Sequence, residues 1–293
     1  MKLGILGIGR MGSAIAERLL DCGHTLTVWN RSPQKATILI ERGATLAVSP
    51  IDVVENSEIV ISILTDAKAI EDCYCDLLKK PLNGKTFIEM STVRPITEQN
   101  LAKQIRAQGG TIVECPVGGT VTPAREGKLF GLVGGIAQDV DRVRPILEQM
   151  CRRVEHVGEV GSGASLKLAI NLPLLVYWQA IGEALALAQP IGLDPARLLD
   201  ILSDTSGAPS ILKLRAPAIA SSLKGIKGGG AHFNLDSIRK DLRTMIEEGE
   251  ALGYQLPLAS STLTVFDQAS AGGLGEGDGT EVAAWWLKAS CKK

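Results

Sequence analysis

MKLGILGIGRMG, residues 1–12, decides the fold of the N-terminal half of this chain. Its apolar run, residues 3–6, predicts a strand, and the glycine pattern G-x-G-x-x-G starts directly behind that run. The amphipathic segment Ser13–Leu20 predicts a helix after the glycines. This order is typical of dinucleotide-binding folds, because the helix N-terminus presents free N–H groups and a positive dipole end to phosphates.

The three glycines of the pattern have separate expected roles. Gly7 permits the tight turn, Gly9 lets the backbone approach a pyrophosphate, and Gly12 lets the helix pack closely on the strand. A glycine-rich turn without a ligand is the alternative interpretation. The apolar run 25–29 (TLTVW) favours the dinucleotide interpretation, because it supplies a second strand at the distance expected for a βαβ unit.

Composition excludes several classes of protein. The chain has 293 residues, enough for two domains, with 45% hydrophobic and 22% charged residues, as is usual for a soluble protein. A net charge of −1 gives no electrostatic case for a nucleic-acid or membrane partner. We expect no membrane span, no signal peptide and a cytoplasmic location. The six cysteines are expected to be structural thiols, and no Cys/His set suggests a metal site.

Strands and helices are expected to alternate in the first half, which predicts a doubly wound parallel sheet. The expected strands are 3–6, 26–29, 59–63, 86–89, 111–114, 131–133 and 154–156. The expected helices between them are 13–22, 33–42, 51–56, 67–78, 96–108 and 138–150.

The pattern changes after about residue 160. We expect a long helix over 164–191, containing Pro173 as a kink, then helices over 194–202, 211–220, 235–252 and 258–271 with a glycine-rich loop at 225–230. The predicted fold is therefore an α/β domain, residues 1–162, followed by an all-α domain, residues 163–293, with the long helix joining them.

The end of the second strand predicts the cofactor. NAD enzymes usually carry a carboxylate here to bind the ribose 2′-hydroxyl, but this chain has Asn30, Arg31 and Ser32, with Lys35 nearby. Arg31 could pair with a 2′-phosphate, and Asn30 and Ser32 could donate hydrogen bonds to it. The segment favours NADP over NAD, and a solvated arginine at a strand end is the alternative.

Lys167 and Asn171 are four residues apart and share one face of the predicted long helix. Their neighbours are apolar, so Lys167 is either a surface residue with a buried stem or a buried functional amine. Hydride addition to a carbonyl needs a proton donor, and a partly desolvated lysine beside a cation can act as one. Spacing alone leaves both interpretations open.

Four motifs together resemble the β-hydroxyacid dehydrogenase family, which includes 3-hydroxyisobutyrate dehydrogenase and glyoxylate/succinic semialdehyde reductase. They are GIGRMGSAIAERLLDCGHTLTVWNR at 7–31, ECPVGGTVTPAREGKLFGLVGG at 114–135, GSGASLKLAIN at 161–171 and FNLDSIRKDL at 233–242. The resemblance covers essentially the whole chain. It implies a Rossmann domain followed by a helical substrate and oligomerisation domain.

The resemblance also implies roles for single residues. Lys167 falls on the family's catalytic lysine and Asn171 on its substrate-orienting asparagine, although the preceding residue is Ile170 where the family often has a second asparagine. The residues expected to contact the cofactor are Gly7, Ile8, Gly9, Arg10, Met11, Gly12, Asn30, Arg31, Ser32, Leu64, Thr65, Thr92 and Lys240. The residues expected to contact substrate are Ser91, Gly118, Gly119, Thr120 and Asn171.

One position departs from the family pattern. The second motif commonly reads Pro-Val-Ser-Gly-Gly, and its serine holds the substrate carboxylate, whereas Gly118 stands at that position here. Losing a hydrogen bond to a charged group weakens binding by roughly 1.5–3 kcal/mol if nothing compensates. Thr120 is the expected replacement, and the departure bears on substrate identity more than on reaction type.

The sequence therefore predicts an NADPH-dependent oxidoreductase that reduces a small aldehyde acid such as glyoxylate, succinic semialdehyde or tartronate semialdehyde, with 3-hydroxy acid oxidation as the reverse reaction. Two alternatives are an imine reductase, which Lys167 argues against, and a non-catalytic NADP-binding module. The apolar circumference of residues 164–191 predicts a homodimer or homotetramer.

Overall fold

The computed structural model describes residues 1–226 and 230–290, so the predicted loop at 225–230 lies partly, and Cys291 wholly, outside them. The chain divides into two compact units, Met1–Ala169 and Ile170–Lys293. The first is an α/β unit, and the described part of the second is helical. The long helix α8 (Ser162–Ala188) begins in the first unit and continues, through Pro173, in the second.

The first unit alternates strands and helices much as predicted. Its strands are β1 (Lys2–Leu6), β2 (Thr25–Trp29), β3 (Thr45–Leu46), β4 (Ile59–Ser62), β5 (Thr86–Glu89), β6 (Thr111–Glu114), β7 (Val117–Gly118), β8 (Leu129–Gly134) and β9 (Cys151–Gly158). Its helices are α1 (Arg10–Asp21), η1 (Pro33–Ala36), α2 (Thr37–Glu41), α3 (Pro50–Glu55), α4 (Ala67–Tyr74), η2 (Leu77–Lys79), α5 (Pro95–Ala107), α6 (Val121–Arg125) and α7 (Ala137–Met150). The short elements β3, β7 and α6 were not predicted.

The sheet is doubly wound, as predicted. It was predicted to be parallel, but it contains antiparallel pairs as well. Strands β3, β2, β1, β4, β5 and β6 lie side by side in that order and are parallel. Strand β8 then pairs antiparallel with β6 and β7, and β9 pairs parallel with β8. The connection from β7 to β8, residues 119–128 with the short helix α6, is shorter than a parallel crossover requires, so β8 returns antiparallel.

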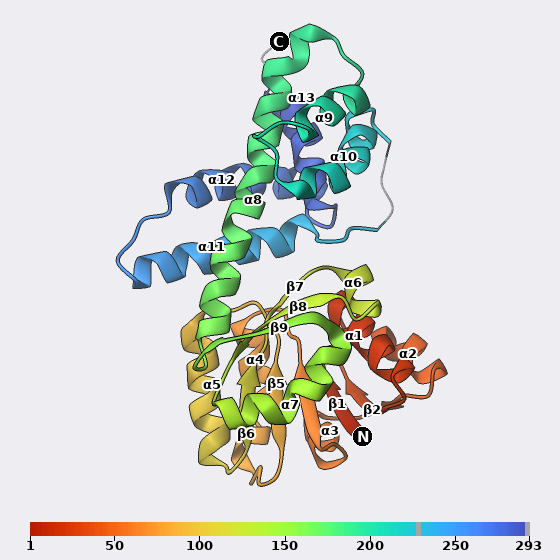
Figure 1. Cartoon of the computed structure of the whole chain (residues 1–293), viewed down its shortest axis with the longest axis vertical. Coiled ribbons are helices and arrows are strands. Elements are labelled where there is room, and N and C mark those ends of the chain that lie inside the picture. The colour runs from red at the N-terminus through yellow and green to blue at the C-terminus, as the bar shows by residue number, and fades with distance from the viewer. Residues whose placement is uncertain (227–229, 291–293) are drawn as a thin grey trace. The chain divides into compact units, whose positions relative to one another are not determined.

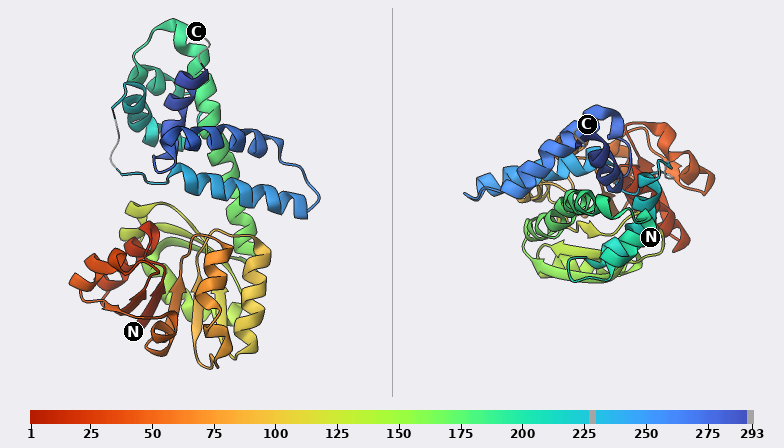
Figure 2. Two further views of the ribbon diagram at one scale, coloured as in Figure 1. Left: turned by 180° about the vertical axis from the view of Figure 1, so that it is seen from behind. Right: turned by 90° about the horizontal axis from the view of Figure 1, so that it is seen from above.

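Helices cover both faces of this sheet (Figure 1). One apolar cluster joins α1, α2 and α7 to the strands, with Ile15, Leu39 and Leu147 fully or almost fully buried. The other joins α3, α4 and α5 to the opposite face, with Tyr74 and Ile105 fully buried. Figure 2 shows the two helical layers of this unit from further directions. The strands between them are almost continuously apolar, as sheets buried on both faces require.

A row of paired residues crosses the C-terminal edge of the parallel strands. Backbone pairing sets Leu6 beside both Trp29 and Ser62, Ser62 beside Glu89, and Glu89 beside Glu114. Polar residues on neighbouring strands are thereby brought together at the edge where open α/β sheets bind ligands. Both glutamates were predicted only as the ends of strands.

Three carboxyl groups are fully buried beside this row: Glu89, Glu98 of α5 and Glu114. Burial, followed by the charges of Glu89 and Glu114, holds the pKa of Glu98 well above its usual range. Burial also raises the pKa of Glu89, whose carboxyl lies against that of Glu98. Two ionised carboxylates would repel each other there, so burial beside the charge of Glu89 favours the protonated form of Glu98. The folded chain therefore retains protons that the unfolded chain releases.

The second unit consists of the rest of α8 and further helices. They are η3 (Gln189–Ile191), α9 (Pro195–Ser203), α10 (Ser210–Leu223), α11 (Leu235–Ala251), α12 (Pro257–Ala269), the short turns η4 (Ser270–Leu274) and η5 (Gly279–Glu281), and α13 (Val282–Ser290). Helix α11 packs against α12, and α13 packs against both α10 and α12. Four of these helices match the predicted ranges closely, while α13 was not predicted.

Contrary to the sequence expectation, one segment meets the length and hydropathy criteria of a membrane span. It is Ser162–Ile191, with a mean hydropathy of 1.3. Core helices of soluble proteins meet the same criteria, and 44% of the segment's most apolar window is buried inside the protein. The segment also carries Lys167 and Glu183. We therefore assign no membrane location to it.

The buried carboxyls predict a pH dependence of stability. Unfolded Glu98 loses its proton near pH 4.3, whereas folded Glu98, whose pKa is held well above that value, keeps it, so unfolding releases a proton and stability falls as pH rises above about 4.3. Glu98→Gln removes this step. The slope of unfolding free energy against pH should then become shallower by about 1.4 kcal/mol per pH unit, as measured by urea denaturation. Glu71→Gln, on the exposed face of α4, is the control. Equal slopes in the two variants would contradict the prediction.

Candidate active site

The glycine turn between β1 and α1 has a distinct constraint at each glycine. Gly7 has φ +99°, and a Cβ there would lie 2.3 Å from the Ile63 carbonyl oxygen. A Cβ on Gly12 would lie 1.9 Å from the carbonyl oxygen of Gly7, so only glycine allows this helix-to-turn contact. A Cβ on Gly9 would meet no atom of the chain within 4 Å. The space over Gly9 is thus open to a ligand, whereas Gly7 and Gly12 shape the turn.

The N-terminus of α1 fits a pyrophosphate. Gly9 precedes this 12-residue helix and supplies no side-chain cap, and the first turn contains no acidic residue. Arg10 and Met11 begin the helix. The backbone N–H groups of the first turn and the positive end of the helix dipole favour an anion at this position. The residues present therefore fit a dinucleotide.

Asn30 ties the glycine turn to the end of β2. Its Oδ1 accepts a hydrogen bond of 3.0 Å from the backbone N–H of Ile8, and its Nδ2 donates one of 2.9 Å to the Ser32 carbonyl. The amide therefore shapes the cofactor loop. The predicted hydrogen bond from Asn30 to a 2′-phosphate is limited to the second N–H of that amide.

Cationic side chains follow β2. Arg31 and Lys35 are exposed, as is Ser32. Neither cation has a hydrogen bond or an ion pair within the described part of the chain, and no carboxylate occurs between Trp29 and Lys35. An anion beside Arg31 would therefore meet positive charge without having to displace an internal partner.

Ser91 makes hydrogen bonds to two neighbouring segments of the protein. It is 2% exposed, its hydroxyl accepts a 2.8 Å hydrogen bond from the Leu64 N–H, and the same hydroxyl donates to Glu89. The hydroxyl thus connects the loop after β4 to the end of β5. The predicted contact of Ser91 with substrate stays a prediction. Thr65 is exposed, and Thr92 is half-buried.

The predicted carboxylate-binding loop follows β6. Gly119 has φ +127°, and a Cβ there would lie 2.8 Å from Leu129, so glycine is required. Gly118 is half-buried and has no such conformation, and a Cβ there would lie at an ordinary 3.6 Å from Phe130. Thr120 precedes α6 and its side chain caps no N–H. The glycine that departs from the family pattern is therefore not required by the backbone.

Helix α8 begins on a buried carboxylate. Glu114 Oε1 accepts hydrogen bonds from the N–H groups of Gly161 and Gly163, at 2.6 and 2.7 Å. Burial raises the pKa of Glu114 to about 7, and the backbone N–H groups partly oppose that shift. Lys167 follows one turn after Gly163 and is only 8% exposed. Lys167 was predicted as a site residue, whereas Glu114 at the start of the same helix was not.

In the second unit, Asp241 joins two predicted site residues. Its Oδ2 accepts a long hydrogen bond of 3.4 Å from Asn171 Nδ2, and its Oδ1 pairs with Lys240 Nζ at 2.5 Å. Asp241 is 3% exposed and Asn171 is 8% exposed. Asn171, on α8, is therefore connected through one carboxylate to Lys240 on α11. In the sequence, Asp241 directly follows the predicted site residue Lys240, and an acid beside a site lysine is the signal that could have predicted this connection.

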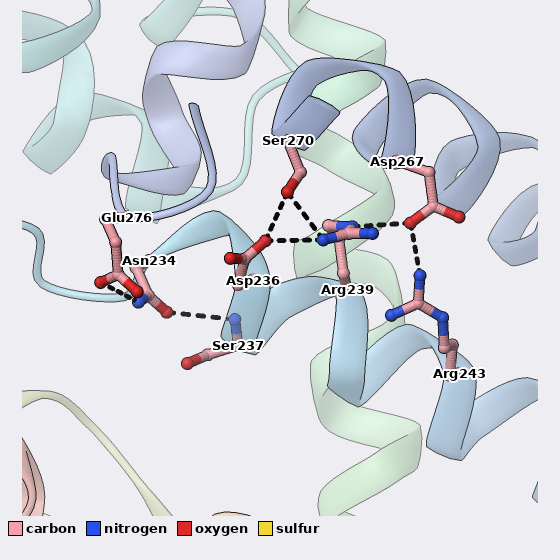
Figure 3. A network of polar contacts seen from close by, with 8 residues as sticks. All are labelled: Asn234, Asp236, Ser237, Arg239, Arg243, Asp267, Ser270 and Glu276. Atoms are coloured by element: carbon pink, nitrogen blue, oxygen red, sulfur yellow. Dashed lines mark hydrogen bonds and ion pairs between the residues drawn. The ribbon is translucent and has the colours of Figure 1, made fainter. Parts of the chain in front are cut away.

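A polar network fixes the helix that carries Lys240 (Figure 3). Arg239 donates to Asp236 and Asp267, each at 2.6 Å, and to the Ser270 hydroxyl at 2.7 Å. Hydrogen bonds from Ser270 and Arg239 hold the pKa of Asp236 below its usual range. Asn234 caps α11 through the Ser237 N–H. The start of α11 is thereby fixed to α12 and to the segment after it.

The described cysteines, 22, 73, 75, 115 and 151, are free thiols. No group of three potential metal ligands occurs in the described ranges 1–226 and 230–290.

Known families match both halves of the chain. The family described as the NAD binding domain of 6-phosphogluconate dehydrogenase matches residues 2–158. The family described as NAD-binding of NADP-dependent 3-hydroxyisobutyrate dehydrogenase matches residues 161–286.

Among solved structures, 3-hydroxyisobutyrate dehydrogenase of Mycobacterium tuberculosis with L-serine has a TM-score of 0.84 at 26% identity, covering 96% of this chain and 97% of that one. Psf3 in complex with NADP+ and 2-OPP also has a TM-score of 0.84, at 27% identity, covering 97% of this chain and 99% of that one. An imine reductase of Streptomyces aurantiacus, covering 100% of both chains, has a TM-score of 0.66 at 22% identity, which shows a shared fold only.

Curated relatives span the whole described fold. The chain is 33% identical over 269 residues to 3-hydroxyisobutyrate dehydrogenase of Pseudomonas aeruginosa, covering 90% of both. It is 32% identical over 281 residues to glyoxylate/succinic semialdehyde reductase 1 of Arabidopsis thaliana, covering 95% of this chain and 96% of the relative. It is also 34% identical over 273 residues to human cytokine-like nuclear factor N-PAC, covering 92% of this chain but 48% of that protein. These matches run through both units in order, and the chain therefore belongs to the β-hydroxyacid dehydrogenase family.

Proposed function

We propose that this protein is an NADPH-dependent reductase of a small aldehyde acid, with Lys167 as the general acid. Family membership supports an NAD(P)-dependent β-hydroxyacid dehydrogenase. The observation that carries the finer proposal is the buried Lys167, one turn after the Gly161–Gly163 segment that Glu114 holds. Glyoxylate, succinic semialdehyde and tartronate semialdehyde are the proposed substrates.

The proposed reduction requires a proton donor beside the carbonyl oxygen of the substrate. A bound nicotinamide cofactor would supply the hydride. Negative charge develops on the carbonyl oxygen as its carbon is reduced, and Lys167 Nζ would hold the proton for that oxygen. In the direction of alcohol oxidation, the same amine would accept the proton. Asn171 would orient the substrate from the same face of α8.

The choice of NADP over NAD rests on the end of β2. Arg31 and Lys35 are exposed and unpaired within the described residues, and a carboxylate that would repel a 2′-phosphate is missing between Trp29 and Lys35. NAD enzymes use such a carboxylate for the ribose 2′-hydroxyl. Because cells keep NADP mostly reduced, we propose aldehyde reduction as the working direction.

The alternatives have weaker support. The imine reductase of Streptomyces aurantiacus shares the fold, at a lower TM-score than the 3-hydroxyisobutyrate dehydrogenase of Mycobacterium tuberculosis. A non-catalytic NADP-binding module would not need Lys167 and Asn171, both of which this chain carries buried on α8. The homo-oligomeric state, the cytoplasmic location and the lack of a nucleic-acid or membrane partner stay predictions.

The role of Lys167 predicts a large catalytic loss on its removal. Lys167→Ala should lower kcat for aldehyde reduction by roughly 10²–10⁴-fold, the usual contribution of a general acid. Binding of NADPH, followed by its fluorescence, should be unchanged. Lys103→Ala, on the exposed side of α5, is the control and should keep full activity. Near-full activity of Lys167→Ala would refute the proposed mechanism.

The cofactor proposal predicts that initial rates with NADPH exceed those with NADH. Arg31→Ala should raise the KM for NADPH by about 10- to 100-fold, because a hydrogen bond to a charged group contributes about 1.5–3 kcal/mol. The KM for NADH should not change, since NADH lacks the 2′-phosphate. A wild-type preference for NADH, or equal effects of the substitution on both cofactors, would exclude this cofactor assignment.

Gly118 predicts a change in substrate preference. Serine fits at this position without backbone strain, so Gly118→Ser should lower the KM for glyoxylate by about ten-fold or more through a new hydrogen bond to its carboxylate. The matched control is Gly119→Ser, which should lose stability because φ at Gly119 is +127° and Leu129 blocks the side chain. If Gly118→Ser folds normally and leaves every KM unchanged, this residue does not contact the carboxylate.

A further inference from the structure

Glu114 is a buried acid that the proposed reaction does not use. It is the last residue of β6, is 0% exposed, and binds two backbone N–H groups through a single oxygen. Both groups belong to the segment that starts α8. A strand of the sheet is thus joined directly to the helix that carries Lys167, within the first unit.

Three glycines make room for this contact. A Cβ on Gly134 would lie 2.2 Å from Glu114 Oε1, and a Cβ on Gly163 would lie 2.4 Å from the Leu132 carbonyl and 3.1 Å from the same carboxylate oxygen. Gly161 has φ +106°, and a Cβ there would lie 2.6 Å from the side-chain amide of Gln99. The Gly161-Ser162-Gly163 sequence therefore lets the backbone close around the carboxylate.

The charge of Glu114 is balanced between opposing effects. Burial and the nearby Glu89 disfavour the ionised form, and Glu98 and Cys115 are further acidic groups that face it. The N–H groups of Gly161, Gly163 and Ala164 favour that form, as does the dipole of α8. Its pKa of about 7 lies where the group changes charge near neutral pH.

We propose that Glu114 is a positioning residue, whose carboxylate fixes the first turn of α8 and thereby the position of Lys167. The inference rests on the proposed role of Lys167. A carboxylate binds N–H groups more strongly than a neutral oxygen does, so the ionised form holds the turn most firmly. Small displacements of a catalytic group lower rates strongly, because the reacting atoms must meet in a narrow geometry.

Two substitutions separate the charge of Glu114 from its hydrogen bonds. Glu114→Gln keeps an oxygen in place but removes the charge, and Glu114→Ala removes both. We expect kcat to fall by roughly 10- to 100-fold in Glu114→Ala and by less in Glu114→Gln, with NADPH binding unchanged. Glu98→Gln is the matched control, because it removes a buried carboxyl of the same cluster that has no bond to α8. It should keep the wild-type kcat.

The pH profile gives a readout that a merely structural role would not change. As the pH falls from about 8 to about 6, protonation of Glu114 should lower the wild-type kcat. Glu114→Gln should lack this step and have similar kcat values at the two pH values. Glu98→Gln should keep the step. Wild-type kcat and an unchanged pH profile in Glu114→Gln would overturn the proposal, even if Glu114→Ala fails to fold.

Hydrogen exchange tests the anchor without any turnover. Amide exchange in residues 161–164 should be faster in Glu114→Gln than in wild type and Glu98→Gln. If Lys167→Ala proves active, the proposed function fails, and faster exchange in Glu114→Gln would still establish the contact with α8. Unchanged exchange at 161–164 would overturn the positioning role itself.

Discussion

The first unit depends on the backbone N–H groups at the N-termini of α1 and α8, which have no partner within their own helices. Each helix start presents such groups, which must be bound by something. At α1 the turn has no acidic residue and no side-chain cap, and the space over Gly9 is open. At α8 the carboxylate of Glu114 binds the corresponding groups. The first helix is built to receive an external anion, and the second carries an anion supplied by the chain.

This contrast explains the buried acids. A carboxylate under α8 is costly because it is desolvated, and the charge of the nearby Glu89 adds to that cost. Glu89 in turn binds the hydroxyl and the N–H of Ser91, whose hydroxyl accepts from the Leu64 N–H. The same row of strand ends thus shapes the loop expected to pass the cofactor and the helix expected to carry the acid. One cluster supports both because backbone pairing sets Glu89 beside Glu114.

The parts that sequence could predict are those with local signals. Strands β5 and β6 were predicted to the residue, since buried parallel strands are continuous apolar runs. The two-residue strand β3 is exposed throughout and the five-residue helix α6 contains Pro123, so neither has a usable pattern. The antiparallel direction of β8 depends on pairing with distant residues, which no local pattern encodes.

The site was predictable to a similar extent. Glycines, Lys167 and Asn171 have recognisable spacing, whereas a hydrogen-bond partner depends on the folded chain. Asn30 and Ser91 show the difference, because both were expected to contact ligands and both bind backbone groups of neighbouring loops. Glu114 and Asp241 were not assigned roles from spacing, and their partners lie 47 and 70 residues away. Short polar side chains at strand ends form hydrogen bonds to neighbouring loops, and only their remaining donors and acceptors can bind a ligand.

Gly118 and Gly119 illustrate how structure separates residues that sequence treats alike. Gly119 must be glycine, because its φ is +127° and Leu129 closes the space beside it. Gly118 has ordinary backbone geometry and room for a side chain beside Phe130. The shape of the loop therefore depends on position 119, and position 118 is free to set its chemistry. A glycine at 118 leaves a backbone N–H and empty volume where a hydroxyl could stand, so a serine at this position would leave the fold unchanged.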